Sequence, residues 1–177
     1  WDSGDIPWFL LVLPLFGVAL AVVALRAWIR KRKFGISTLK LRNLPAYLGE
    51  RLQATVQTGI PVVNDPSKEF LVRLICARRE TVLDAAGDER VLEKKLWSTE
   101  QKILGEVSSL RPVFQVMVDF PVPDDLPPTE LLPEDDRTLW KLEVTAKMKG
   151  VDYAAQFEVP VYQRPAGDKT FKTGHNV

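Results

Sequence analysis

The side chains that could carry chemistry in this chain are few and do not form a recognisable set. The single histidine, His175, lies close to the C-terminus, which excludes a histidine-based triad or a multi-histidine metal site within the chain. Carboxylate pairs occur at Asp124/Asp125 and Asp135/Asp136, but their neighbours are polar and offer no apolar pocket to shift a pKa. The sequence contains no GxSxG, GxxxxGK(S/T) or GxGxxG motif. We therefore expect no catalytic, cofactor-binding or metal-binding residues, and no enzyme activity.

The acidic pairs belong to a connection between strands. Residues 123–136 contain four prolines and six acids, and proline lacks the backbone donor that a sheet ladder needs. The acids lack the regular spacing around a central glycine that calcium loops show. A solvated loop is the expected structure.

Cys76 is the only cysteine, so the chain cannot form an internal disulfide, which suits a reducing compartment. It lies in an apolar run, residues 70–77, where it shares the parity of the large apolar residues. A buried packing role is favoured over a reactive thiol, because a reactive thiol needs exposure as well as basic neighbours.

Charge is distributed unevenly in this 177-residue chain, whose net charge is +1. The length allows one core-bearing domain and an anchor. Five basic residues follow the first apolar segment: Arg26, Arg30, Lys31, Arg32 and Lys33. The remainder is slightly acidic, which argues against a nucleic-acid-binding protein, since such a protein carries its positive charge across a folded face.

The first segment predicts a transmembrane helix. Residues 6–25 form a run of twenty residues without a charged side chain, and a helix of that length spans roughly 30 Å, the thickness of a bilayer core. Trp8 and Trp28 lie at its ends, where indole rings favour the interface. A buried helix of a soluble protein conflicts with this length, and a signal peptide would carry its basic residues before the apolar run. Residues 1–33 are thus predicted to be a transmembrane helix with a basic stop.

The basic cluster also predicts an orientation. Asp2 and Asp5 precede the apolar run, whereas all five basic residues follow it, so the positive-inside rule places the rest of the chain in the cytoplasm. We expect a single visible span in the inner (plasma) membrane. The basic residues are expected to touch anionic lipid at the bilayer surface. The chain starts at Trp1 rather than Met, which is expected of a processed protein or a piece of a longer one.

Residues 34–163 predict a single antiparallel β-sandwich, because apolar residues recur with period two and turn signals recur every eight to fifteen residues. Strands are expected over residues 36–41, 51–58, 70–77, 111–122 and 140–146, followed by a return strand over 151–161. Residues 70–77 are apolar at both parities and are expected to be covered on both faces. Residues 91–101 suit a helix or a strand, and a hairpin with residues 81–83 favours the strand. Gly150 suits the positive φ of a tight turn, and residues 164–177 are expected to form a flexible tail.

Two sets of residues resemble known families. The stretch FPVPDDLPPTE, followed by TLWKLEVTAKMKGVDYAAQFEVPVY, resembles arrestin-like β-sandwich domains, where a Leu-Pro-Pro loop precedes an aromatic-led strand. The stretch FGISTLKLRNLPAYLGERLQATV, with FLVRLICARR and Leu96-Trp97, resembles the C-terminal region of a bacterial membrane protein family of unknown function with a cytosolic β-domain. The arrestin-like resemblance implies a non-enzymatic adaptor. Arrestins carry two sandwiches and this chain carries one, so cargo or receptor binding is not implied.

These features predict a membrane-anchored, non-enzymatic protein-interaction module that needs no cofactor. Its partners would be the bilayer and an unidentified protein that docks on an exposed edge strand. One alternative is a structural subunit of a larger membrane assembly, packed through small and kinking residues of its helix at Pro14, Gly17, Ala19 and Ala21. The other alternative is an enzyme with an unrecognised site.

Overall fold

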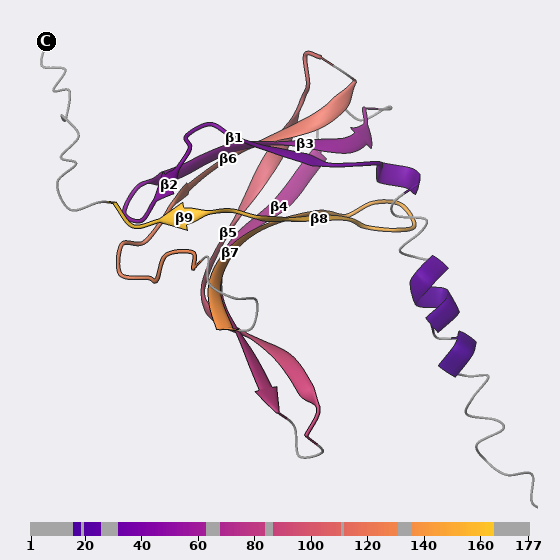
Figure 1. The fold of residues 1–177 in the computed structure, drawn as a ribbon. Helices are drawn as coiled ribbons and strands as arrows, with labels where there is room; N and C mark the ends of the chain where they lie inside the picture. Colours follow the sequence, from indigo (N-terminus) through magenta and orange to yellow (C-terminus); the bar gives the residue numbers. More distant parts are fainter. Residues whose placement is uncertain are drawn as a thin grey trace, which may run out of the picture.

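The chain is mainly β, as the sequence predicted. The structure, a computed structural model, describes residues 16–18, 20–25, 32–62, 68–83, 87–110, 112–130 and 136–164 (Figure 1). Residues 16–18, 20–25 and 32–34 are helical. The strands of the described residues are β1 (Thr38–Leu41), β2 (Ala46–Tyr47), β3 (Arg51–Pro61), β4 (Lys68–Leu83), β5 (Glu89–Val107), β6 (Val113–Pro121), β7 (Asp136–Ala146), β8 (Tyr153–Glu158) and β9 (Val161–Tyr162).

Alternation in the sequence becomes one buried face in each of the inner strands. Along β3, every second residue from Leu52 to Ile60 is buried, and along β6 the buried positions run from Phe114 to Phe120. The two strands pair antiparallel, with Leu52 opposite Phe120, so their apolar residues share one face. Successive side chains of a strand point to opposite faces, which explains why these strands were predictable.

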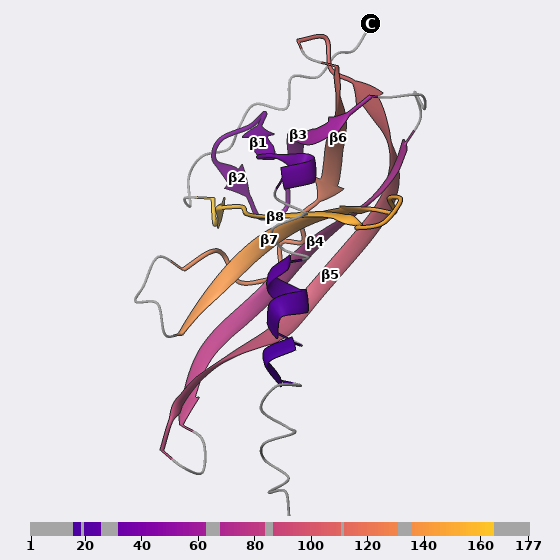
Figure 2. The same ribbon diagram turned by 90° about the vertical axis from the view of Figure 1, so that its right-hand side faces the viewer.

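Seven strands form one sheet in the order β1-β3-β6-β5-β4-β7-β8, and every neighbouring pair is antiparallel. The predicted two-sheet sandwich is therefore only partly right. The 19-residue strand β5 runs along β4 and then joins β6 at Glu106 and Val107, which makes the two halves continuous. The sheet folds over so that β1, β3 and β6 lie across β4, β7 and β8 (Figure 2). A separate pair, β2 and β9, is parallel, which the sequence did not predict.

The folded sheet encloses one apolar core. Phe70 in β4 lies 6.0 Å, between ring centroids, from Phe114 in β6 and 6.1 Å from Tyr153 in β8. Tyr153 also meets Phe34 edge to face at 5.4 Å. These contacts join strands from both halves of the sheet. Fully buried aromatic side chains each remove a large apolar area from water, so they contribute strongly to the stability of the core.

Two expectations about individual strands are wrong. Residues 70–77 lie in a central strand, but only one face of β4 is buried, and Leu71, Arg73 and Ile75 on the other face are partly exposed because no further layer covers them. The predicted return strand ends at Glu158. Val161, which was expected in the same strand, pairs with Ala46 of β2 and not with β7.

At the start of the predicted tail, Arg164 pairs with Glu50 and lies over the ring of Tyr47, so this residue is held against the domain. The rest of that prediction, residues 165–177, lies outside the described residues.

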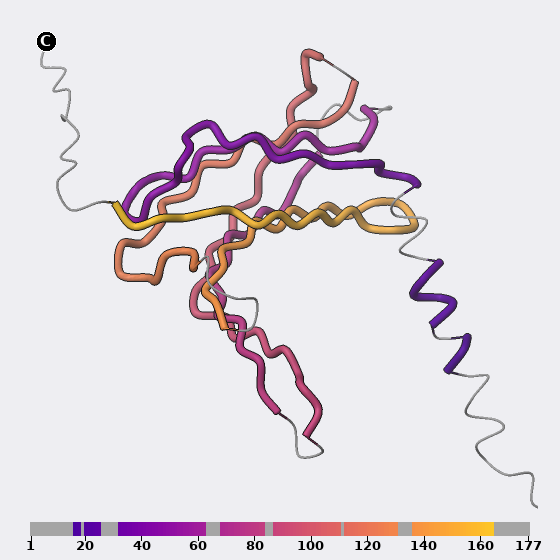
Figure 3. Tube along the Cα trace, in the orientation of Figure 1, coloured from indigo at the N-terminus to yellow at the C-terminus, as the bar shows by residue number. Residues whose placement is uncertain are grey.

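Beyond Glu80, the last residue of β4 that pairs with β7, strands β4 and β5 continue together as a hairpin arm (Figure 3). The pairing of β4 with β5 confirms the predicted hairpin and the strand assignment of residues 91–101. Near the tip of the arm, Leu83, Val91 and Leu92 are all more than half exposed. The arm therefore displays apolar side chains to its surroundings.

Among the residues that the structure describes, no helix is both long and apolar enough to cross a bilayer. The predicted span, residues 6–25, is described only in part. Other predicted membrane-contacting residues also lie outside the described ranges: Trp8, Arg26, Trp28, Arg30 and Lys31.

Candidate functional site

The residues with chemical potential do not converge in the structure. Asp124 and Asp125 are exposed on the connection after β6, whereas Asp136 begins β7 and pairs with Arg78. His175 and Asp135 lie outside the described ranges. Within those ranges, no group of three or more His, Cys, Asp or Glu residues could hold a metal ion.

Cys76 is buried, as expected. It lies opposite Trp97 on β5 and Trp140 on β7, and the two indole rings are 5.9 Å apart. Burial raises the pKa of its thiol to about 11, because the apolar surroundings disfavour the thiolate. The thiol is therefore protonated at neutral pH and serves as a small apolar group in the core.

The described residues of the acidic connection contact the domain through ion pairs and hydrogen bonds, which the expected solvated loop would lack. Arg78 contacts Asp136 at 2.9 Å and Glu130 at 3.3 Å, and Glu130 accepts a hydrogen bond from the backbone N–H of Thr138. The hydrogen bond to Asp136 is the main cause that raises the pKa of Arg78. The indole N–H of Trp140 donates to the carbonyl of Pro127 at 3.1 Å. These contacts attach the described part of the connection, residues 123–130, to β4 and β7.

The basic cluster is described only at Arg32 and Lys33. The ammonium group of Lys33 donates to the carbonyl of Lys149 at 2.7 Å and lies 5.1 Å from the ring centroid of Phe34. Lys149 belongs to the turn between β7 and β8. The structure therefore brings the end of the basic cluster against this turn of the domain.

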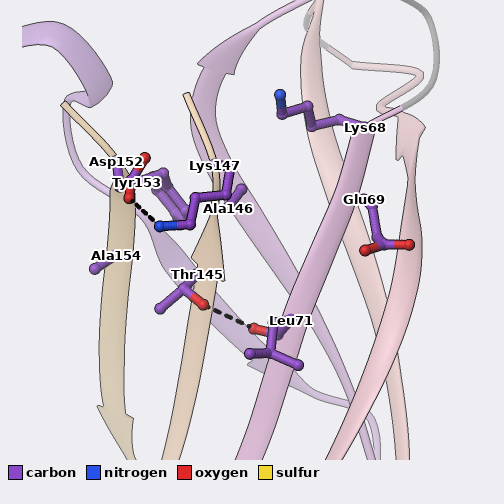
Figure 4. Close-up of a pocket in the computed structure, with 9 residues that line it drawn as sticks. All are labelled: Lys68, Glu69, Leu71, Thr145, Ala146, Lys147, Asp152, Tyr153 and Ala154. Atoms are coloured by element: carbon purple, nitrogen blue, oxygen red, sulfur yellow. Dashed lines mark hydrogen bonds and ion pairs between the residues drawn. The ribbon is translucent and has the colours of Figure 1, made fainter. Parts of the chain in front are cut away.

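A hollow of about 500 Å³ lies beside the same turn (Figure 4). Its lining residues are Lys68, Glu69, Leu71, Thr145, Ala146, Lys147, Asp152, Tyr153 and Ala154. The charged side chains are of both signs, and Lys147 pairs with Asp152 at 2.9 Å while remaining 94% exposed. Thr145 donates its hydroxyl to the carbonyl of Leu71. Tyr153 carries the buried hydroxyl of this lining, and that hydroxyl is hydrogen-bonded to Ser37.

A second groove, of about 440 Å³, separates the two end strands of the sheet. Its lining residues are Ser37, Thr38, Leu39, Leu41, Leu44, Phe157 and Glu158. One end is closed by a hydrogen bond of 2.8 Å between the hydroxyls of Ser37 and Tyr153. In the chain, β2 follows β1 and β9 follows β8. The parallel pairing of β2 with β9 therefore holds the continuations of the two end strands together. We call this feature the β1–β8 groove.

The β1–β8 groove combines main-chain and apolar surfaces. In the described part of the chain, no strand pairs with the outer edge of β1 or of β8. The floor carries Leu39, Leu41 and Phe157, which pack against the core and are partly exposed, and Leu44 at the rim is 68% exposed. Unpaired backbone groups beside apolar side chains are what an extended peptide needs in order to add to a sheet.

A third candidate surface is the edge of β5 that faces away from β4. Over the described residues, β6 pairs with this edge at Glu106 and Val107, and no strand pairs with it between Glu89 and Gly105. A register shift in the pairing with β4 between Cys76 and Ala77 places a bulge in β5 at Leu96. The regular unpaired edge therefore covers residues 97–105, which we call the β5 edge.

The sequence did not identify either edge, although it predicted that an edge strand would serve for docking. Leu44 follows the end of a predicted strand and looked like part of a turn. Leu104 is exposed although it lies within a strand. The local signal of an unusual strand was the poor alternation of apolar and polar residues over 91–101. A strand that its own domain covers on one face shows a cleaner alternation.

No protein-family model matches the sequence, and no curated protein matches it. Among solved structures, the chain is similar to Spo0M, a sporulation control protein from Bacillus subtilis, at 14% identity and a TM-score of 0.47, over 72% of this chain and 49% of that one. It is similar to a DUF4466 family protein from Parabacteroides merdae at 11% identity and a TM-score of 0.36, over 72% and 43% of the two chains. A β-glucosidase from Listeria innocua matches at 15% identity and a TM-score of 0.27, over 71% and 16%. The chain thus spans about half the length of Spo0M, and likenesses this distant transfer no activity.

Proposed function

We propose that this chain is a non-enzymatic protein-interaction module, and that its β1–β8 groove binds an extended segment of a partner protein. The observation that carries the proposal is the groove itself, where two unpaired strand edges flank an apolar floor. An extended segment satisfies unpaired backbone groups through ladder hydrogen bonds and gains specificity from alternate side chains.

The sheet topology specifies how the segment would run. Six successive antiparallel pairings separate β1 from β8, so these two strands point the same way around the sheet. One segment that runs antiparallel to both would close the sheet. Its inward side chains would lie on Leu39, Leu41 and Phe157, so the favoured ligand has apolar residues at alternate positions.

Membrane attachment forms the second part of the proposal. We propose that residues 6–25 anchor the chain in the inner (plasma) membrane and that the β-domain lies on the cytoplasmic side, where the partner protein would be met. The uncharged run and the basic residues that follow it support this placement.

The arrestin-like resemblance of the sequence agrees with an adaptor rather than an enzyme. The hollow beside the β7–β8 turn offers an ion pair at its rim, and the β1–β8 groove offers leucines, a phenylalanine, hydroxyls and the carboxylate of Glu158. Neither set of lining residues pairs a nucleophile with a general base. We therefore propose binding, without catalysis, as the activity of the domain.

A photocrosslinking experiment tests the groove. A benzophenone amino acid is placed at Leu44, and at Met117 as the control, since Met117 is 52% exposed on β6, which does not line the groove. We expect position 44 to crosslink a discrete partner from the membrane fraction through an extended, alternately apolar segment, and position 117 to give no such product.

A synthetic peptide of the crosslinked segment then serves as the ligand of the purified chain. Leu44→Asp should weaken its binding at least tenfold, whereas Met117→Asp should leave the affinity unchanged. Identical crosslinked products from positions 44 and 117, or an affinity for the peptide that Leu44→Asp leaves unchanged, would contradict the proposal.

A further inference from the structure

We propose that two copies of this chain associate through the β5 edge, with the two β5 strands antiparallel and Gln101 at the two-fold axis. The inference concerns a surface distinct from the β1–β8 groove, and it stands whether or not the groove binds a partner.

The limits of the β5 edge place its centre at Gln101. On one side, the bulge at Leu96 interrupts the regular strand, and on the other, Glu106 begins the pairing with β6. The nine residues between these limits, 97–105, are centred on Gln101. A bulge and an occupied edge both stop a ladder from extending, so a second strand that uses the whole edge must centre on this residue.

The charges of the edge are self-complementary about the same centre. With Gln101 opposite its own copy, Glu100 lies opposite Lys102 of the second copy, and the reverse pair repeats this contact across the axis. Opposite charges that face each other across a strand pair stabilise it, and a two-fold interface makes every such contact twice.

Other centres lose this complementarity. A centre at Glu100 or at Lys102 would place each of these residues opposite its own copy, with like charges facing. A centre at Ile103 would place Glu100 opposite Glu106 and would reach into the segment that β6 already pairs. A centre at Thr99 opposes no charges within residues 97–105. Like charges directly opposite each other are destabilising, so the register about Gln101 is the favoured one.

The charged side chains of the edge are available for contacts with a second copy. Glu100 binds Arg73 at 2.9 Å and Lys102 binds Glu69 at 3.3 Å, yet the side chains of Glu100 and Lys102 are 57% and 70% exposed. A carboxylate accepts several hydrogen bonds and an ammonium group donates three, so each can keep its present partner while it binds the second copy. Association would also remove the unpaired backbone of the edge from water, which natural proteins otherwise protect.

Disulfide trapping tests the register on the full chain, purified in detergent and in native membranes. Two residues directly opposite in an antiparallel pair have Cα atoms about 4.5–5.5 Å apart, which a disulfide spans. Gln101→Cys should therefore give a covalent dimer under mild oxidation. The control is Ser98→Cys, which lies on the same edge but opposite Leu104 of the second copy, too far from its own equivalent to react. Equal crosslinking of the two variants would overturn the register.

A charge swap tests the contact itself. Glu100→Lys and Lys102→Glu should each raise the dimer dissociation constant at least tenfold, because each puts like charges opposite. The double variant E100K/K102E restores opposite charges across the axis but places like charges against Arg73 and Glu69 within each chain, so its dissociation constant should lie between those of the single variants and that of the unaltered chain. Sedimentation equilibrium gives these constants, and circular dichroism verifies that each variant is folded. A chain that stays monomeric at high concentration, or a double variant no better than the singles, would overturn the proposal.

Discussion

Substitution of Gly59 by alanine should destabilise the domain, because the backbone of another segment occupies the space of a side chain at this position. A Cβ atom on Gly59 would lie 1.4 Å from the carbonyl oxygen of Phe34 and 2.6 Å from its carbonyl carbon. Both are backbone atoms, so rotation of a side chain cannot relieve the clash. The segment at Phe34 must move away from β3.

The expected cost follows from what Phe34 would lose. Its side chain is 3% exposed and meets the ring of Tyr153 edge to face. Burial of a phenylalanine contributes about 1.5–3 kcal/mol, and an edge-to-face pair contributes about 0.5–1.5 kcal/mol more. Alanine restricts the unfolded chain relative to glycine, which offsets about 0.4–1 kcal/mol. We expect Gly59→Ala to lower the free energy of unfolding by about 1–4 kcal/mol.

Urea unfolding followed by near-UV circular dichroism measures this loss, and a double-mutant cycle tests its cause. If the alanine acts by displacing Phe34, then Gly59→Ala should cost much less in a Phe34→Ala background, where there is no aromatic side chain left to displace. A loss below about 0.5 kcal/mol, the usual range for a substitution away from such features, would refute the clash. Additive losses in the cycle would refute the role given to Phe34.

Two further predictions concern buried polar groups. Because burial raises the pKa of Cys76 from 9.0 to about 11, the unfolded thiol ionises first as the pH rises, and the free energy of unfolding should fall between about pH 9 and pH 11. When the free energy of unfolding is measured as a function of pH, this fall should be smaller in Cys76→Ala. A pH profile identical to that of the unaltered chain would contradict the role given to Cys76. Lys141 is 8% exposed and contacts Glu93 at 2.5 Å. Glu93→Gln leaves the ammonium group of Lys141 without a counter-charge and should cost about 1–3 kcal/mol in chemical unfolding. Lys141→Met, which removes the buried charge itself, should cost less, and the reverse ranking would contradict this account.

Most of the strands were predictable because their signal is local. The alternation from Phe114 to Phe120 and from Trp140 to Ala146 places every second side chain on one face, whatever the strand pairs with. The glycine turn at Gly150 was predictable for the same reason, and its φ is +87°. The exposed outer face of β4 was not predictable, because coverage of a face depends on a second layer that the local pattern does not encode.

The candidate surfaces lie beyond such local signals. The outer edges of β1 and β8 are open because of the strand order, and the β5 edge is open because β5 leaves β6 after two paired residues. Leu44 and Gln101 have no distinguishing neighbours in the sequence. Their significance comes from the long-range pairing that surrounds them.

The sequence by itself determined the strand content of the domain, the buried position of Cys76 and the absence of familiar catalytic motifs, because side-chain parity and residue chemistry are properties of short stretches. The tertiary structure alone decided that the sheet is continuous through β5, that β2 and β9 are parallel, and that particular strand edges remain unpaired. Those features depend on which distant segments meet and in what register, and loop lengths and side-chain packing across the whole core set that outcome.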